Sequence, residues 1–489
     1  MNSSLIIIFG FLLFAIYLGI RAKKGKTMNL EEWSVGGRKL GTVFVFFLMA
    51  GEAYTTFTFL GGSGFTYAAG GPAFYIFNAA YFVLSYWLLP PIWKYAKKHK
   101  LLSQSDFFAH KYDSTALGVL VAVVGVVAMI PYIILQLKGL GIIVSEASYG
   151  AISSTAAIWI GVISVTIFVV VSGINGSAWT AVLKDILIVL VVVFIGFYLP
   201  YHYYGGLRPM FEAVSEAKSN FITLPDQGLS TSWFVSTLIL WTLGAYMWPH
   251  IFGAVYSSKS SNALKRNAII MPLYQIILVL IIFVGFTAVL QVPGLTGSDT
   301  DLALFKIVKK TFDPWFVGVI GAAGVLAALV PSSVLLLSSA TIISKNIVKV
   351  MKPSTTEDAL NKSTRYLVVV VAAVALFFTF NGANTITTLL LMGYSLVTQL
   401  FPALICSLLK NNPVTKQGAM AGMVAGVATV AYISISGMTI GTIFPSLPQV
   451  IKDFDVGIVA LLVNFIFTFI VSMLTKARVS RSSNAEISS

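Results

Sequence analysis

Thirteen apolar stretches recur along the 489 residues, and a helix needs about 20 apolar residues to cross a bilayer. They lie at residues 4–20, 42–68, 72–93, 116–146, 154–171, 178–203, 233–256, 267–291, 314–344, 366–380, 384–409, 417–435 and 456–475. Only 10% of the residues are charged, against about 25% in ordinary soluble chains. This is too little charge to cover a water-soluble surface. The sequence therefore predicts an all-α polytopic membrane protein with about 13 transmembrane helices.

Lys and Arg are distributed unevenly between the loops that join these stretches. One set of alternate loops holds 24 of the 32 basic residues, and the opposite set holds six. Because cytoplasmic loops carry an excess of Lys and Arg, we expect a multi-pass protein of the cell membrane with its N-terminus outside and its C-terminus in the cytoplasm. The formal net charge of +14 is therefore assigned to cytoplasmic loops, and no nucleic-acid or protein partner is expected.

Other functional classes find little support in the sequence. A single cysteine, Cys406, excludes a disulfide scaffold and a cysteine-based metal site. We find no nucleotide-binding P-loop and no phosphate-binding glycine fingerprint, so no enzymatic activity is expected. A membrane-bound sensor would need a signalling domain, and only thirteen residues follow Lys476. An ion channel would need a repeated pore loop, which we do not find.

The composition of the second stretch predicts an interrupted helix. It reads FVFFLMAGEAYTTFTFLGGSGFTYAAGG and combines Glu52 with clusters of Thr and Gly. Thr can bond its own backbone carbonyl, and Gly weakens a helix. At such a break the carbonyls lose their helical partners and can coordinate a cation. The alternative is an unbroken helix packed through its glycines. Glu52 itself is a candidate cation ligand or proton carrier.

Several polar residues in other stretches need a reason to lie in the bilayer, since charged groups there are costly. Lys138 could pair with the carboxylate of a substrate, could be the partner of Glu52, or could extend to the surface. Gln136 lies beside it, and Asn78 could contact a substrate or bond a neighbouring helix. Lys184 and Asp185 are adjacent, so they point about 100° apart on a helix, and we expect them to anchor the sixth stretch at the cytoplasmic face.

The seventh and ninth stretches each contain a proline. In WTLGAYMWPHIFGAVY, Pro249 predicts a second break or kink. Nearby Tyr246 and Trp248 could form a gate over a substrate or simply pack. In AALVPSSVLLLSSATIISKN, Ser332 and Ser333 follow Pro331. Their hydroxyls could bind Na⁺, or they could bond their own backbone around the kink.

Taken in order, six motifs resemble the sodium:solute symporter family, most closely its monocarboxylate permease branch. They are EEWSVGGRKLG, MAGEAYTTFTFLGGSGFTYAAGGP, IPYIILQLKG, SGINGSAWTAVLKD, MWPHIFGAVYSSKSSNALKRNA and LAALVPSSVLLLSSATIISKN. The resemblance implies a LeuT-type core of two inverted five-helix repeats within one transporter domain, 1–489. The expected parts are a first helix and cytoplasmic loop (1–40), the two repeats (41–203 and 233–409), two C-terminal helices (417–475) and a cytoplasmic tail (476–489).

The resemblance also implies an ion site. The sodium-binding position of the family would use the backbone carbonyls of Gly51 and Tyr54 together with the hydroxyls of Ser332 and Ser333. An ungapped match places the family's hydroxyl pair on Val330 and Pro331 instead, so the two serines fit only after a short shift. Many relatives carry Thr-Asp where this chain has Thr180-Ala181, which argues against a second sodium site.

Substrate residues follow from the same resemblance. Hydroxyls of Thr55 and Thr58 and, more loosely, the Lys138 ammonium would hold the acid group, while Phe57 would shape the apolar end. Further candidates are Asn78, Gln136, Tyr246 and Trp248. The expected function is Na⁺-coupled uptake of a small organic acid, a monocarboxylate such as lactate or pyruvate, or of a small amino acid. The alternative is proton-coupled transport through Glu52.

Overall fold

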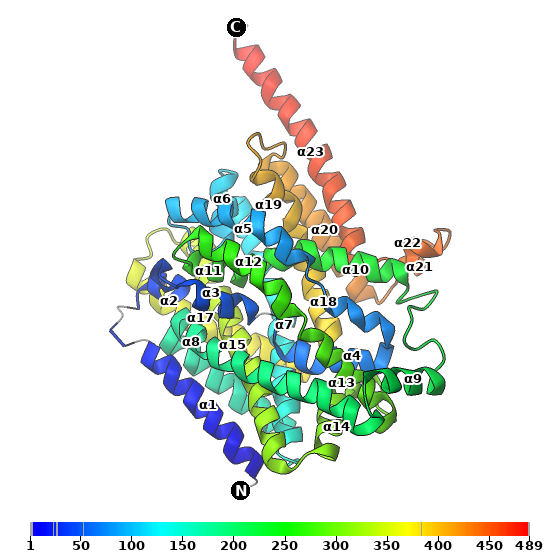
Figure 1. The fold of residues 1–489 in the computed structure, drawn as a ribbon. Coiled ribbons are helices and arrows are strands. Elements are labelled where there is room, and N and C mark those ends of the chain that lie inside the picture. Colours follow the sequence, from blue (N-terminus) through cyan, green and yellow to red (C-terminus); the bar gives the residue numbers. More distant parts are fainter. Residues whose placement is uncertain (1–2, 23, 26–27, 52, 383, 488–489) are drawn as a thin grey trace.

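The computed structural model describes residues 3–22, 24–25, 28–51, 53–382 and 384–487, and their regular elements are helices (Figure 1). The N- and C-termini lie at opposite ends of the molecule in this view. The first half of the chain contains α1 (Ser3–Ala22), α2 (Leu30–Val35), η1 (Gly36–Arg38), α3 (Thr42–Ala50), η2 (Phe57–Gly61), α4 (Gly62–Ala69), η3 (Gly71–Ile76), α5 (Ala80–Lys98), α6 (Gln104–Lys111), α7 (Thr115–Ala147) and α8 (Ser154–Tyr204).

The second half begins on the short surface helix α9 (Leu207–Ala217). It continues through α10 (Thr231–Gly244), η4 (Ala245–Met247), α11 (Pro249–Ser257), α12 (Ser261–Gln275), α13 (Leu278–Gln291), η5 (Gly297–Leu302), α14 (Ala303–Thr311), α15 (Pro314–Ile342), η6 (Ile343–Val348), α16 (Lys349–Met351), α17 (Glu357–Phe380), α18 (Ile386–Val397), η7 (Thr398–Leu400) and α19 (Phe401–Ser407). The last elements are α20 (Lys416–Ser436), α21 (Ile440–Ile443), α22 (Gln449–Lys452) and α23 (Val456–Ile487).

The predicted thirteen crossings can be matched to these elements. Within the described residues, ten helices are long and apolar enough to cross a membrane, and the bent pair α10 and α11 adds an eleventh. α8 has 51 residues and would be about 76 Å long as one straight helix. Gly173 divides it, because its φ of 56° and ψ of −155° are not helical, and α8 therefore supplies two crossings. The interrupted α3–α4 segment is matched to the remaining predicted crossing, residues 42–68.

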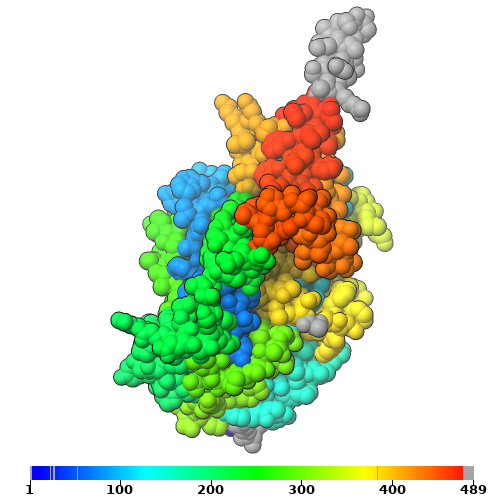
Figure 2. All heavy atoms as spheres, turned by 90° about the vertical axis from the view of Figure 1, so that its right-hand side faces the viewer, coloured from blue at the N-terminus to red at the C-terminus, as the bar shows by residue number. Residues whose placement is uncertain are grey.

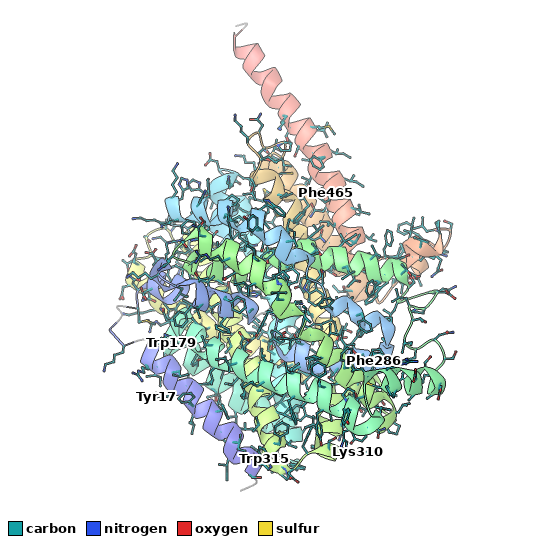
Figure 3. All side chains as sticks on the ribbon, in the orientation of Figure 1. Tyr17, Trp179, Phe286, Lys310, Trp315 and Phe465 are labelled. Atoms are coloured by element: carbon teal, nitrogen blue, oxygen red, sulfur yellow. The ribbon has the colours of Figure 1, made fainter. Side chains whose placement is uncertain are left out.

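The centre of the molecule is α15. In the apolar window of Pro314–Met351, 94% of the residues are buried, and the helix packs against α1, α7 and α8. Large apolar side chains are exposed instead on α1, α8, α17 and α23, where they would face lipid. Exposed aromatic residues, including Tyr17 and Trp315, lie at the rim of the molecule (Figure 3). This burial pattern is that of a multi-pass membrane protein.

The surface segments at one end lie close together. Figure 2 shows the 439–455 segment against the segment that leads into α10. The Gly228 N–H donates to the Asp453 carboxylate at 3.1 Å, and the Thr237 hydroxyl donates to Asp455 at 3.3 Å. These bonds connect the C-terminal helices to the start of the second repeat.

Candidate functional site

The helix predicted to be interrupted is broken where the sequence placed the break. α3 ends at Ala50, residues 51 and 53–55 form turns and bends, and a turn of π-helix begins at Phe57. Side chains satisfy part of the freed backbone: the Thr55 hydroxyl accepts from the Phe57 N–H at 3.1 Å, and the Thr58 hydroxyl donates to the Ala53 carbonyl. The broken-helix prediction is confirmed. Glu52 falls outside the described residues.

The two carbonyls predicted to bind sodium are held by a lysine. Lys184 Nζ donates to the Gly51 carbonyl at 2.9 Å and to the Tyr54 carbonyl at 2.8 Å. The same ammonium lies 2.9 Å from Asp185 Oδ1, and both side chains are fully buried. At these distances the two carbonyl contacts are charge-assisted hydrogen bonds, and the contact with Asp185 is an ion pair. The arrangement therefore places a positive charge where the sequence predicts an ion.

This finding corrects the expectation that Lys184 and Asp185 anchor the sixth stretch at the cytoplasmic face and do not pair with each other. The helix starts earlier than its apolar run, just after Gly173, so Lys184 lies about 15 Å along it. A lysine side chain is also long enough to bend back toward the neighbouring carboxylate. Adjacent positions on a helix therefore do not prevent the pair.

The serine hydroxyls assigned to sodium bond within the protein. Ser332 Oγ donates to the Ala328 carbonyl at 2.7 Å, and Ser333 Oγ to the Val330 carbonyl at 2.6 Å. Ser333 Oγ also lies 2.7 Å from Ser177 Oγ of α8. Ser177 precedes Lys184 by about two helical turns, on the same face of α8. The structure thus gives both serines the backbone-bonding role that the sequence left as the alternative, on the α8 face that carries Lys184.

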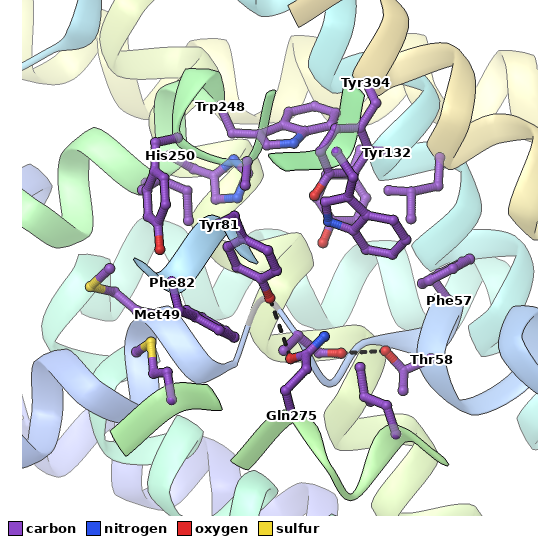
Figure 4. A pocket seen from close by; sticks show the side chains of 18 residues that line it. Met49, Phe57, Thr58, Tyr81, Phe82, Tyr132, Trp248, His250, Gln275 and Tyr394 are labelled. Atoms are coloured by element: carbon purple, nitrogen blue, oxygen red, sulfur yellow. Dashed lines mark hydrogen bonds between the residues drawn. The ribbon is translucent and has the colours of Figure 1, made fainter. Parts of the chain in front are cut away.

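A cavity of about 40 Å³ lies between the two interrupted helices (Figure 4). The second interruption is the predicted one: α10 and α11 meet at 52°, and Trp248 between them is extended. The lining residues are Met49, Ala53, Phe57, Thr58, Tyr81, Phe82, Tyr132, Trp241, Ala245, Tyr246, Trp248, His250, Ile251, Met271, Gln275, Leu278, Leu390 and Tyr394. Substrates of transporters built from discontinuous helices bind at such breaks.

The walls of this cavity are aromatic, and its polar groups are uncharged hydrogen-bonding ones. Among the described residues that line it there is no Lys, Arg, Asp or Glu. Tyr81 Oη donates to Gln275 Oε1 at 3.3 Å. Trp248 is buried, and its Nε1–H has no hydrogen-bond partner in the described part of the chain. A buried donor is costly when unpaired, so this N–H is available to an acceptor atom of a bound solute.

Four of the residues proposed from the sequence line the cavity: Phe57, Thr58, Tyr246 and Trp248. Sequence reasoning missed four others that line it, namely Tyr81, Tyr132, Gln275 and Tyr394. No local sequence pattern distinguishes any of these four residues from ordinary packing. Only the packing of α5, α7, α12 and α18 brings them together.

Two other proposed substrate residues hold neighbouring segments together. The Asn78 amide donates to the Leu238 carbonyl and the Thr242 hydroxyl, each at 3.1 Å, which joins η3 and α5 to α10. Gln136 Oε1 accepts from the Thr56 hydroxyl at 2.6 Å. Both amides are buried. Neither they nor Thr55 is among the residues that line the cavity, so the structure does not bring these three candidates to it.

Lys138 is held at the far side of the break from Lys184. Its Nζ donates to the Asn384 carbonyl at 2.6 Å and lies 3.7 Å from Asp301 Oδ2. Asp301 also accepts from the Ile386 N–H at 3.1 Å. Burial raises the pKa of Asp301 to about 6, although the Lys138 ammonium opposes the rise. The expected position of Lys138 beside a substrate carboxylate is therefore not observed, because this ion pair takes up its ammonium.

A partly buried ion pair joins α6 to η6. Lys345 Nζ is 2.5 Å from Asp106 Oδ2, and Asn346 donates to the other oxygen at 2.7 Å. Burial alone would raise the pKa of Asp106, but the Lys345 ammonium and these hydrogen bonds hold it below its ordinary value.

Within the described residues, no group of three or more His, Cys, Asp or Glu could hold a metal ion.

Comparison with known proteins agrees with this architecture. The family model of the sodium:solute symporter family matches residues 33–426. The chain is 61% identical to the uncharacterized symporter YhjB of Bacillus subtilis (strain 168), over 97% of this chain and 98% of the relative. It is 27% identical to a monocarboxylate transport permease protein of Rhizobium johnstonii, over 83% of each chain.

A solved structure described as the substrate-bound outward-open state of a Na⁺-coupled sialic acid symporter superposes with a TM-score of 0.79. It is 15% identical and covers 97% of this chain and 98% of its own. At this identity the likeness shows the fold, a LeuT-type core of two inverted five-helix repeats. The fold, the two helix breaks and the family match over most of the sequence lead to one conclusion: this chain belongs to the sodium:solute symporter family and is a membrane transporter, not an enzyme.

Proposed function

We propose that this protein is a secondary active symporter that takes up a small monocarboxylate by alternating access. The observation that carries the proposal is the cavity between the two interrupted helices, with aromatic walls and an unpaired Trp248 N–H. Its volume of about 40 Å³ exceeds the roughly 10–15 Å³ that one water molecule needs, so only a compact solute fits it. Family membership supports solute transport, and the cavity supports a compact solute with an apolar part.

The chemistry of the lining supports an organic acid. Trp248 Nε1, the Gln275 amide and the tyrosine hydroxyls are donors that a carboxylate can accept from. Lys184 supplies a positive charge at the break, where it binds the carbonyls of Gly51 and Tyr54. Ala53, between these two residues in the chain, lines the cavity. The relative that is a monocarboxylate transport permease favours the same substrate class.

Two coupling ions are candidates. Membership of the sodium:solute symporter family favours Na⁺. If Na⁺ is the coupling ion, it raises the affinity for the substrate, and the substrate raises the affinity for Na⁺ by the same factor. One observation favours the proton as second candidate: the Lys184 ammonium already holds the carbonyls of Gly51 and Tyr54, where the family would bind Na⁺. Under either candidate, the proposed repeats 41–203 and 233–409 move relative to each other around the cavity, with the N-terminus outside and the C-terminus cytoplasmic.

Uptake into proteoliposomes tests this proposal. Labelled lactate, pyruvate and a small neutral amino acid are offered to the purified protein under an inward Na⁺ gradient, in choline, and under an inward proton gradient. We expect a monocarboxylate to accumulate above protein-free liposomes when one of the two cation gradients is present. Transport of the amino acid alone would reject the substrate class. Equal accumulation in all three buffers would reject symport.

A further inference from the structure

The contact that the proposed function does not explain is the one between Lys184 and the helix break. Its ammonium lies between 2.8 and 2.9 Å from three oxygens, those of the Gly51 and Tyr54 carbonyls and of Asp185. Neither Lys184 nor Asp185 is exposed. A break in a transmembrane helix releases carbonyl oxygens that need a partner, and here the partner is a cation attached to the chain itself.

Among the described residues, few other titratable groups surround this ammonium. Those that face Lys184 and its carboxylate are Asp185 on α8, Tyr54 at the break and Tyr274 on α12. Tyr54 Oη donates to the Tyr274 carbonyl at 2.6 Å, and the Tyr274 hydroxyl faces Asp185. α1 and α15, which also pack on α8, approach this part of it with Ala15 and Ser333. The Lys184–Asp185 pair is therefore neutral as a unit.

We infer that the Lys184 ammonium is the built-in occupant of the cation site at the break and takes the place of Na⁺ there. Two cations cannot share one set of carbonyl oxygens in a buried site, because their repulsion is weakly screened. While Lys184 is protonated, Na⁺ is excluded from Gly51 and Tyr54. Any response of the wild-type protein to Na⁺ must then arise elsewhere, or after the ammonium has left.

Removing the ammonium should uncover the site. The Lys184→Ala variant would leave two carbonyl oxygens and the Asp185 carboxylate around the vacated position. These are hard oxygen ligands, with one negative charge to balance one Na⁺. The inference rests on the proposed function for its meaning in transport, since a coupling Na⁺ must either displace Lys184 or bind elsewhere. Binding of Na⁺ to the Lys184→Ala variant does not depend on which solute the protein carries.

Thermal unfolding of the purified full-length protein in detergent tests the inference. Wild type, Lys184→Ala and Lys184→Gln are compared in sodium chloride and choline chloride at equal ionic strength. We expect wild type to unfold at the same temperature in both salts. Both variants should unfold at lower temperature in choline and recover by several degrees in Na⁺, with a saturable dependence on Na⁺ concentration. A ligand that binds only the folded state stabilises it in this saturable manner.

Matched variants separate the ion site from a general loss of stability. Lys345→Ala removes an ammonium from another, partly buried carboxylate, Asp106, and should show no selective recovery in Na⁺. Adding Asp185→Asn to Lys184→Ala should abolish the recovery. The inference is overturned if wild type shows a saturable Na⁺ shift that Lys184→Ala removes, or if the folded variants respond equally to Na⁺ and choline. If Lys184→Ala does not fold, Lys184→Gln alone decides. Failure of the uptake assay would reject the proposed function and leave this result unaffected.

Discussion

At the scale of single residues, the cavity is lined by hydrogen-bond donors that a bound solute can accept from. Trp248 illustrates this. Its ring packs against Tyr132 with centroids 5.0 Å apart and against Tyr394 at 5.3 Å, so its position is set by neighbours (Figure 4). Its Nε1–H remains without a partner in the described chain. A side chain held rigidly with a free donor is suited to orient a bound anion.

The Trp248→Phe variant should keep the aromatic packing and lose the donor. A hydrogen bond to a charged group contributes about 1.5–3 kcal/mol, so we expect substrate affinity to fall about 10- to 100-fold. The measurement is the concentration dependence of monocarboxylate uptake, or direct binding to purified protein. Thermal unfolding serves as the control and should change little. Unchanged affinity would mean that this N–H does not meet the substrate.

At the scale of elements, α8 shows how one residue divides a long helix into two crossings. Gly173 adopts φ 56° and ψ −155°, a region that is essentially restricted to glycine. A Cβ built there would lie 2.6 Å from the Trp33 carbonyl oxygen. The break ties α8 to α2 and sets where the second half of α8 begins. It therefore also sets how deep Lys184 lies.

Gly173→Ala should destabilise the protein by about 1–3 kcal/mol, the usual cost of a residue held in a disfavoured backbone region. Gly10→Ala is the control, because a Cβ there meets no atom within 4 Å and alanine favours helix. Chemical or thermal unfolding of both variants makes the comparison. If Gly173→Ala matched Gly10→Ala in stability, the two halves of α8 could not depend on this backbone conformation.

At the scale of the whole molecule, Asp301 joins three elements that are distant in sequence. It belongs to η5, pairs with Lys138 of α7 and accepts from the N–H of Ile386 at the start of α18. Its carboxylate is nearly inaccessible to solvent, and burial raises its pKa to about 6. This junction lies between the two repeats. We expect its charge state to influence how tightly they are held together.

The raised pKa gives a signed pH dependence. Because the folded pKa lies above the ordinary value of 3.8, ionisation of Asp301 costs stability as pH rises from about 4 to about 6, and the cost is constant above that range. The shift corresponds to at most about 3 kcal/mol. Thermal unfolding across pH 4.5–7.5 should show this decline in wild type relative to Asp301→Asn. Parallel pH profiles for the two proteins would contradict it.

Features that depend on neighbouring residues in the chain could be predicted from the sequence. The spans depend on runs of apolar residues, because a bilayer accepts little else. The breaks at Gly51–Thr55 and Trp248–Pro249 depend on Gly, Thr and Pro, which act on their own backbone. For this reason the amino-acid sequence by itself determines the fold class and the positions of both interruptions.

Only the tertiary structure decided what fills those interruptions. Tyr81, Tyr132, Gln275 and Tyr394 come from four separate helices, and no spacing along the chain reports that they converge. Lys184 is more than 100 positions from Gly51 and Tyr54. Its sequence position favours a surface anchor, because an isolated charge near a span end usually is one. Its burial depends on where the helix starts and on which freed carbonyls lie within reach of its side chain, and both are properties of packing.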